Sequence, residues 1–206
     1  MKVVVATRNR HKVREIAVLL DEAGLDIEPV TIDDVAPKAE LVENEDTFEG
    51  NALAKARQAS EVCGMPAIAD DSGIEVDALG GAPGVRSARF AGEPCDDGRN
   101  NAKMLREMAG VSAEKRTARY RCAAAFVDAK RREEVVRSGA CEGILLVSPR
   151  GQGGFGYDPL FFLPELGQTM AEIDLAQKNR LSHRAAAFRS LVTAIRDLLP
   201  KKLKAG

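Results

Sequence analysis

Short apolar runs and amphipathic stretches alternate along the chain, a pattern typical of proteins that mix strands with helices. The β-branched run Lys2–Ala6 predicts a buried strand, and a polar loop follows it. A helix is expected next, because apolar side chains recur every three or four residues before Gly24, a suitable stop; they are Val13, Ile16, Ala17 and Leu20. The chain therefore begins with a strand, a loop and a helix.

The later elements are predicted from the same two patterns, short apolar or alternating runs for strands and apolar residues every three or four positions for helices. Further strands are expected over 27–32, 116–128, 133–146 and 160–163, with the middle pair forming an antiparallel hairpin. The Arg and Glu residues that alternate along this hairpin are interpreted as a solvated face. Further helices are expected from near Thr47 to Gly64, through Met104 and Met108 to Gly110, and from Ser182 to Leu198.

The stretch 67–92 carries the most chemistry. Its apolar start, 67–69, predicts the end of a buried strand, and Asp70, Asp71, Ser72 and Gly73 follow as a turn before a second strand begins. Because neighbouring side chains on a strand point to opposite faces, two adjacent carboxylates cannot both be buried without a polar partner. A divalent cation suits that position, and a solvated acidic turn suits it equally on this stretch alone.

Composition narrows the classes of ligand. The chain has 206 residues and a net charge of −1, so no overall electrostatic attraction favours nucleic acid or an anionic membrane. A polyphosphate ligand must then be held by local cationic groups. No signal peptide and no run long enough to span a membrane is expected.

The cysteines and histidines limit the choice of metal. Four cysteines are scattered without a CxxC pair, which indicates a reduced, cytoplasmic protein and gives no support to a zinc site. With only two histidines, a metal held by this chain should be a hard cation on oxygen ligands, most plausibly Mg²⁺.

Three polar groups are candidate ligand contacts. The loop 7–12 precedes a helix, where free backbone N–H groups bind anions; Thr7 and Asn9 add donors and Lys12 a charge, although an ordinary turn capped by Asn fits as well. Asn51 and Lys55 share one helical face, which on its own indicates a solvated surface. The third group, Lys178, His183 and Arg184, lies near the start of the last helix.

Two glycine-rich loops remain. In 151–158, glycines surround Phe155 and Tyr157, whose rings suit a stacked purine, and Asp158 suits its N–H groups; a tight turn with both aromatics in the core is the alternative. The loop Gly80–Gly84 is expected to shape the backbone behind the acidic pair and not to cradle phosphates.

Five blocks of this sequence, in this order, resemble the inosine triphosphate pyrophosphatase, or Ham1-like, family. They are ATRNRHK at 6–12, TFEGNALAKA at 47–56, IADDSGIEVDALGGAPGVRSARFAG at 68–92, GGFGYDPLF at 153–161 and KNRLSHR at 178–184. The resemblance extends over nearly the whole chain.

The resemblance implies an α/β fold, with an elongated mixed β-sheet and flanking helices that form two lobes around a central cleft. It implies one domain over residues 1–206, whose lobes are not independent, and an expected homodimer. The implied activity is Mg²⁺-dependent hydrolysis of ITP, dITP and XTP to the monophosphate and pyrophosphate, which removes deaminated purines from the nucleotide pool.

The resemblance also implies roles for individual residues. Asp71 is the expected base and metal ligand, Glu43 the second metal carboxylate and Asp70 a further ligand. The expected substrate contacts are Thr7, Arg8, Asn9, Arg10, His11, Lys12, Lys55, Ser72, Phe155, Gly156, Tyr157, Asp158, Lys178, His183 and Arg184. Donors among the last three would bind a 6-oxo group and disfavour the amine of adenine.

Two departures from the family pattern leave alternatives open. Arg8 stands where many relatives have Gly, so it either adds a phosphate contact or points outward. Glu45 also replaces a common Gly, so that Glu45 or Glu40 competes with Glu43 as a ligand. The rival functions are a Maf-like pyrophosphatase acting on other nucleotides and a non-catalytic nucleotide-binding protein.

Overall fold

The computed structural model of the chain describes residues 1–198, so the cationic tail at 201–204 lies outside the described residues. Within that range, seven strands form one sheet in the order β2-β1-β3-β4-β5-β6-β7. The strands are β1 (Lys2–Val5), β2 (Glu28–Thr31), β3 (Ala67–Val76), β4 (Thr117–Asp128), β5 (Glu133–Leu145), β6 (Phe161–Leu163) and β7 (Gln168–Thr169).

The sheet is mixed, which confirms the α/β class. Strand β1 runs parallel to both β2 and β3, while β6 runs antiparallel to both β5 and β7. The helices are α1 (Arg10–Glu22), α2 (Ile32–Val35), α3 (Phe48–Cys63), α4 (Asp97–Glu107), α5 (Leu175–Leu181) and α6 (His183–Leu198). No helix within residues 1–198 is long and apolar enough to cross a membrane.

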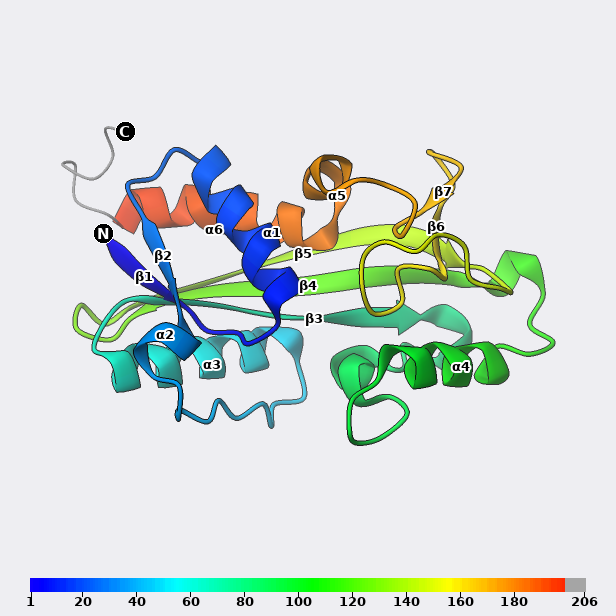
Figure 1. The fold of residues 1–206 in the computed structure, drawn as a ribbon, viewed down its shortest axis with the longest axis horizontal. Coiled ribbons are helices and arrows are strands. Elements are labelled where there is room, and N and C mark those ends of the chain that lie inside the picture. Colours follow the sequence, from blue (N-terminus) through cyan, green and yellow to red (C-terminus); the bar gives the residue numbers. More distant parts are fainter. Residues whose placement is uncertain (199–206) are drawn as a thin grey trace. The chain divides into compact units, whose positions relative to one another are not determined.

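Two compact units divide the chain. Among the described residues, unit 1 contains 1–71, 122–139 and 184–198, and unit 2 contains 72–121 and 140–183. In unit 1, Figure 1 shows α1 and α6 on one face of the sheet and α3 on the other. Alternate residues of β1, Val3 and Val5, point to the face covered by α1 and α6, where they join Ile16 and Phe188 in the core.

Unit 2 has a core of its own. Ile74 and Val76 of β3 pack there with Met104 and Met108, which α4 and the residues just after it supply. Aromatic side chains from β4 and β6 and from the loop before β6 complete the cluster; they are Tyr120, Tyr157 and Phe161. Each unit therefore buries apolar residues supplied by both strands and helices.

Strand β3 differs from the expected strand–turn–strand arrangement, because it runs without interruption through the acidic pair. Gly73 belongs to the strand and does not form a turn. A Cβ atom there would lie 2.3 Å from Ser87 Oγ and 2.5 Å from the Gly84 carbonyl oxygen. The glycine thus permits the 84–87 segment to pack directly against the strand, and Ile74 N–H donates to Ser87 Oγ at 2.9 Å.

Other differences are local. Helix α5 was not expected, and it carries Lys178, which the sequence analysis placed near the start of the last helix. Arg116 is buried and not part of a solvated face, since its guanidinium donates to backbone carbonyls including those of Leu145 and Met108, at 2.7 and 2.9 Å. Arg119 and Glu142 of the hairpin form an ion pair, as expected for a polar face.

Candidate functional site

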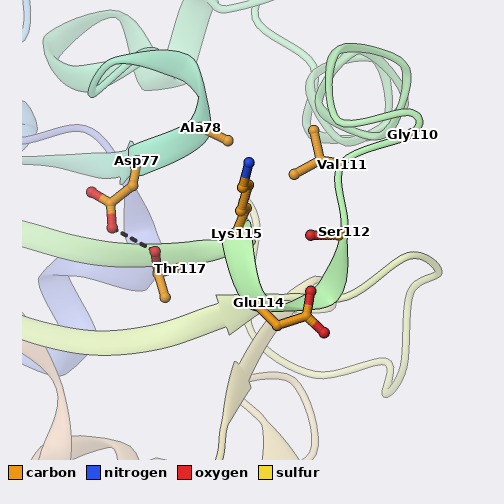
Figure 2. Close-up of a pocket in the computed structure, with 8 residues that line it drawn as sticks. All are labelled: Asp77, Ala78, Gly110, Val111, Ser112, Glu114, Lys115 and Thr117. Carbon is orange, nitrogen blue, oxygen red and sulfur yellow. Dashed lines mark hydrogen bonds between the residues drawn. The ribbon is translucent and has the colours of Figure 1, made fainter.

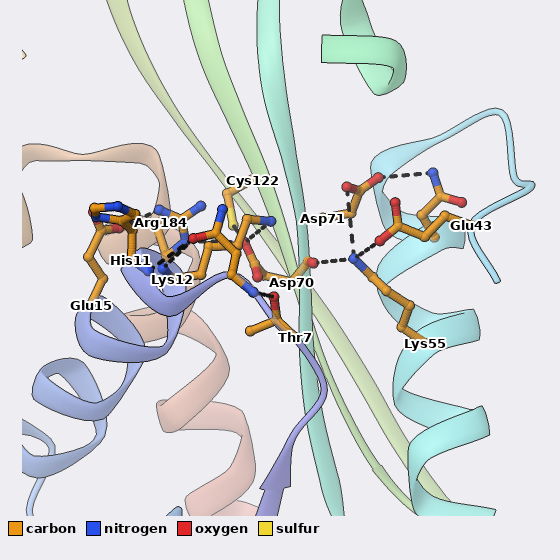
Figure 3. Close-up of polar contacts among 12 residues, drawn as sticks. Thr7, His11, Lys12, Glu15, Glu43, Lys55, Asp70, Asp71, Cys122 and Arg184 are labelled. Atoms are coloured by element: carbon orange, nitrogen blue, oxygen red, sulfur yellow. Dashed lines mark hydrogen bonds and ion pairs between the residues drawn. The ribbon is translucent and has the colours of Figure 1, made fainter. Parts of the chain in front are cut away.

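The two adjacent aspartates of β3 lie on opposite sides of the strand. Figure 3 shows Asp70 directed toward α1 and Arg184, and Asp71 directed toward α3 and Glu43. Both carboxylates are buried, with relative exposures of 0% and 6%. The alternation expected from a strand therefore holds, and each carboxylate has polar partners, so the solvated acidic turn is excluded for these residues.

Asp71 faces two polar residues of α3 that lie one helical turn apart. Asn51 Nδ2 donates to Asp71 Oδ2 at 2.9 Å. Lys55 Nζ donates to the Asp70 carbonyl oxygen at 2.7 Å, pairs with Glu43 Oε1 at 2.5 Å and lies 4.0 Å from Asp71 Oδ1. The Lys55 ammonium therefore joins both carboxylates to the strand backbone.

The interpretation of Asn51 and Lys55 as solvated surface is wrong. Their relative exposures are 1% and 4%, because β3 covers the helical face next to Ala52 and Ala56. A buried charged residue must be paired, and Lys55 is paired with Glu43 and Asp71. Glu43 is thus the residue of the acidic segment that reaches this cluster, and Glu45 instead donates its backbone N–H to Asn51 Oδ1.

The electrostatics of the two groups in this cluster are coupled. Burial raises the pKa of Asp71 above its ordinary value, and nearby Lys55 and Lys12 only partly oppose that effect. Burial alone would lower the pKa of Lys55, but the charges of Asp70, Glu43 and Asp71 outweigh it and raise the pKa. Lys55 is therefore a permanent cation, and Asp71 is a more basic carboxylate than a solvated aspartate.

Asp70 has different partners. Lys12 Nζ lies 3.0 Å from Asp70 Oδ2, and Arg184 Nε lies 3.1 Å from the same oxygen. Arg184 also pairs with the buried Glu15. Burial opposes ionisation of Asp70, but the charges of Lys12 and Arg184 outweigh it and hold the pKa well below the ordinary range. Its other oxygen, Oδ1, has no hydrogen-bond partner among the described residues.

Several polar groups of the loop before α1 already make hydrogen bonds within the protein. Asn9 Oδ1 caps the helix by accepting the N–H groups of His11 and Lys12 at 2.9 and 3.3 Å, and Thr7 Oγ1 accepts the Asn9 N–H at 3.2 Å. Arg8 points outward, where its guanidinium binds Asp33 and the carbonyl oxygens of Pro37 and Ala39. Arg10 and His11 are exposed in the first turn of α1.

A second polar cluster lies in unit 2 and centres on Asp158, which is 3% exposed. Lys178 Nζ lies 2.7 Å from Asp158 Oδ2, and the Phe155 N–H donates to the same oxygen at 2.9 Å. The Lys178 ammonium also lies 4.6 Å from the centroid of the Phe155 ring. Tyr120 Oη donates to Asp158 Oδ1 at 3.1 Å, and the Tyr120 ring stacks on His183.

The sequence block FGYD divides between the Asp158 cluster and the core of unit 2. Phe155 is half-buried beside Lys178. Tyr157 belongs to the core of unit 2, and its hydroxyl donates to the Ser87 carbonyl oxygen at 2.8 Å, so the core alternative holds for this ring. Gly156 is held from α4 at both of its backbone groups: its N–H donates to Asp97 and its carbonyl oxygen accepts from Asn101.

The expected cationic group of Lys178, His183 and Arg184 is divided between the two clusters. Lys178 and His183 belong to the Asp158 cluster of unit 2, whereas Arg184 belongs to the Asp70 cluster of unit 1. Ser72, the first residue of unit 2, follows Asp71 on β3. The sequence separation of 114 residues between Arg184 and Asp70 explains why local patterns did not pair them.

Sequence reasoning named Asn51 but favoured a solvated surface for it, and it missed three other polar residues that these clusters use: Asp97, Asn101 and Tyr120. Two of them offered a signal, because Asp97 and Asn101 lie one helical turn apart on α4. Tyr120 offered none, since an aromatic residue on an apolar strand reads as core.

Unit 2 also contains two cavities away from the expected site residues. One, of about 680 Å³, is lined by Asp77, Ala78, Gly110, Val111, Ser112, Glu114, Lys115 and Thr117, and Figure 2 shows Lys115 directed into it. The other, of about 480 Å³, lies beside Cys141 and Leu166. The residues expected to bind substrate line neither of them.

The carboxylates of unit 1 fit only one kind of metal site. Within residues 1–198, no group of three or more His, Cys, Asp or Glu side chains is placed to hold a metal ion. Glu43 and Asp71 nevertheless meet at the Lys55 ammonium. Mg²⁺ usually takes one or two carboxylates together with waters and substrate phosphates, so two carboxylates suit an ion shared with a phosphate ligand.

The mixed sheet defines an α/β protein that carries two polar clusters, one around Asp70 and Asp71 and one around Asp158. The model of the Ham1 family matches residues 3–194, and the chain belongs to that family. This confirms the resemblance read from the five sequence blocks.

Similar proteins cover almost all of the chain. A dITP/XTP pyrophosphatase of Desulforamulus reducens is 48% identical over 96% of this chain and 97% of its own length. A dITP/XTP pyrophosphatase of Geobacillus kaustophilus is 50% identical over 92% of both chains. A solved HAM1 protein from Coxiella burnetii has a TM-score of 0.86 at 35% identity, covering 96% of this chain and 99% of its own.

Proposed function

We propose that this protein hydrolyses dITP, ITP and XTP to the nucleoside monophosphate and pyrophosphate, and so removes deaminated purines from the nucleotide pool. Membership of the Ham1 family and the dITP/XTP pyrophosphatase relatives support the substrate class. The observation that carries the chemistry is the cluster of Asp71, Glu43 and Lys55, where two carboxylates, one of them buried, pair with one buried cation.

The triphosphate binds through local cations in this proposal. A chain with a net charge of −1 offers no general attraction for a polyanion, so buried lysines must supply it. Lys12 and Lys55 lie on either side of β3 and both hold the Asp70–Asp71 segment. The first N–H groups of α1, next to Thr7 and Asn9, add hydrogen-bond donors. Arg8 contributes least, because Asp33 already holds its guanidinium.

Glu43 and Asp71 would hold Mg²⁺. The ion neutralises charge on the phosphates and polarises the attacking water when it is bound. Asp71 would accept a proton from the attacking water, because its carboxylate lies in the same cluster as Glu43 and Lys55. Asn51 fixes the carboxylate by donating to Oδ2, which directs the remaining lone pairs toward the reacting group.

Asp70 has a supporting role. Its Oδ2 is committed to Lys12 and Arg184, so the residue orients a phosphate-binding lysine. Only Oδ1, which has no partner among the described residues, is available as the further metal ligand that the family resemblance implies.

Purine recognition is assigned to the Asp158 cluster. Phe155 offers a ring face for stacking, and Lys178 and His183 offer N–H donors to a 6-oxo group. The amine of adenine would face these donors without an acceptor, which is a costly mismatch in a buried site. Asp158 is assigned a role through Lys178, whose ammonium lies 2.7 Å from its Oδ2.

The test is pyrophosphate release with Mg²⁺ across dITP, ITP, XTP, GTP, ATP and UTP. We expect turnover of the first three only, and loss of activity after chelation of the metal. Preference for UTP would favour the Maf-like alternative. Binding of dITP without pyrophosphate release would favour a non-catalytic nucleotide-binding protein. The proposed substrate pool places the enzyme in the cytoplasm, and the expected homodimer is checked by light scattering.

A further inference from the structure

Tyr120 contacts two residues of the proposed purine site from a strand that belongs to none of the five recognised sequence blocks. Its hydroxyl donates to Asp158 Oδ1 at 3.1 Å. Its ring stacks on the His183 imidazole, with centroids 4.7 Å apart and planes 13° apart. The other contact of the ring is Phe161 in the core, at 4.5 Å. One side chain therefore links the core of unit 2 to both polar groups.

The Asp158 carboxylate is the point at which this link acts. Oδ2 accepts from Lys178 and from the Phe155 N–H, and Oδ1 accepts from Tyr120. A carboxylate held at only one oxygen can rotate about its Cβ–Cγ bond, and Lys178 would follow it. With the Tyr120 hydroxyl on the second oxygen, both the plane of the carboxylate and the direction of the ammonium are set.

The hydroxyl is suited to this role at neutral pH. Burial raises the pKa of Tyr120 well above its ordinary value, and the negative charge of Asp158 raises it further. The group therefore remains a hydrogen-bond donor under all conditions in which the protein is assayed. The stacked ring at the same time restricts rotation of the His183 imidazole.

We propose that Tyr120 is a positioning residue for purine recognition, which directs Lys178 through Asp158 and orients His183 by stacking. This inference rests on the proposed function. It assigns to Tyr120 an effect on binding of the base and none on the chemistry at the phosphates, because its contacts lie in unit 2 and those of Asp71 and Lys55 in unit 1.

The decisive variant is Tyr120→Phe, which keeps the ring and removes only the hydroxyl. We expect the KM for dITP to rise about tenfold, as for loss of a hydrogen bond to a charged group, with kcat changed less than about twofold. Competitive inhibition by inorganic tripolyphosphate, which has no base, should stay unchanged. Equal weakening of dITP and tripolyphosphate, or an unchanged KM, would overturn the proposal.

A matched control lies on the same strand. Thr117 Oγ1 donates to Asp77 Oδ2 at 2.6 Å, outside both clusters. Thr117→Val removes a hydroxyl-to-carboxylate hydrogen bond of the same kind, and we expect it to leave the KM for dITP unchanged. A KM rise as large as that of Tyr120→Phe would show that loss of any such bond on β4 suffices, which contradicts a specific role.

A double-mutant cycle with Lys178→Met separates positioning from general structure. If Tyr120 acts through Lys178, Tyr120→Phe should add little to the KM increase of Lys178→Met. Full additivity would refute the route through Asp158. Calorimetric binding of inosine monophosphate provides a readout that needs no turnover. If the wild-type protein releases no pyrophosphate from dITP, the proposed function fails. The same double-mutant cycle, measured as affinity for the monophosphate, still decides the role of Tyr120.

Discussion

Asp70 and Asp71 are neighbours with opposite electrostatic surroundings. Lys12 and Arg184 hold the pKa of Asp70 low, against the effect of burial, whereas burial raises the pKa of Asp71. Two carboxylates whose pKa values are moved apart by their environment take different chemical roles. Asp70, which is paired with Lys12 and Arg184, is suited to a structural role. Asp71 is suited to proton transfer.

Replacing Asp71 by Asn tests its assignment as the base. The amide keeps the size of the side chain and can still accept from Asn51, but it cannot take a proton. We expect kcat for dITP to fall by about 10²–10⁴, the usual contribution of a general base, with an additional loss if a metal ligand is removed. Binding of dITP, measured by calorimetry, should persist. Activity near that of the wild type would refute the assignment.

The depressed pKa of Asp70 predicts how stability depends on pH. Unfolded aspartate titrates at about 3.9, and the folded group titrates below that value. Its charge therefore stabilises the folded state above about pH 4, and this contribution is lost as the pH falls through the folded pKa. Urea unfolding between pH 7 and pH 3 should show the beginning of that loss below about pH 4.

Asp70→Asn should be less stable by about 3–5 kcal/mol at pH 7, because Arg184 and Lys12 lose their buried partner. Its unfolding midpoint should then change less than that of the wild type between pH 5 and pH 3. Asp21→Asn, on the exposed side of α1, is the matched control and should follow the wild-type curve. A variant at position 70 that also follows that curve would contradict the prediction.

At the scale of single residues, the sequence predicted which polar residues belong to the clusters. It predicted less well which residues they contact. The strand alternation correctly placed Asp70 and Asp71 on opposite faces. It gave no sign that Arg184 would join Asp70, or that Asn51 and Lys55 would be buried, because those contacts depend on packing between elements far apart in the chain. Helical spacing shows which residues share one face of a helix, but it does not show which other element packs against that face.

At the scale of elements, β3 shows the main error of the sequence interpretation. A glycine after two aspartates and a serine is typical of a turn, but Gly73 continues the strand. The reason is tertiary: the backbone of the 84–87 segment occupies the space where a side chain would lie. Helix boundaries were predicted well, because their signals are local, as with Gly64, which has φ +62° after α3.

The close approach at Gly73 predicts a large effect of one methyl group. Gly73→Ala places a Cβ atom 2.5 Å from the Gly84 carbonyl oxygen, a backbone atom that cannot easily move. We expect a loss of about 1–3 kcal/mol in the free energy of unfolding, measured with urea.

Gly98→Ala is the matched control on α4. The nearest atom to its added Cβ is Asp96 Oδ1 at 3.3 Å, and alanine is the better helix former. Its free energy of unfolding should change by less than about 1 kcal/mol. Equal stability of the two variants would mean that the 84–87 segment moves away from β3 at no cost.

At the scale of the whole chain, the sequence identified the fold class and the order of most elements, but not α2, α5 or β7. It could not show how the residues are shared between the two units, since each unit combines segments from distant parts of the chain. The chain passes from one unit to the other after Asp71, Arg121, Gly139 and His183; the first three positions lie inside strands, and the fourth is the first residue of α6. The continuity of β3, β4 and β5 supports the expectation of a single domain whose two parts do not fold independently.

A pair of spectroscopic probes tests that expectation. The chain has no Trp and two Tyr, and Tyr120 and Tyr157 both belong to unit 2, so intrinsic fluorescence reports on unit 2 alone. The longest helices, α3 and α6 with 16 residues each, belong to unit 1 and dominate the circular dichroism at 222 nm. Because unfolding of one unit must break strands that continue into the other, we expect both signals to change at the same urea concentration. Different urea midpoints for the two signals would show two independently unfolding domains. A larger difference between the midpoints would indicate weaker coupling through the continuous strands.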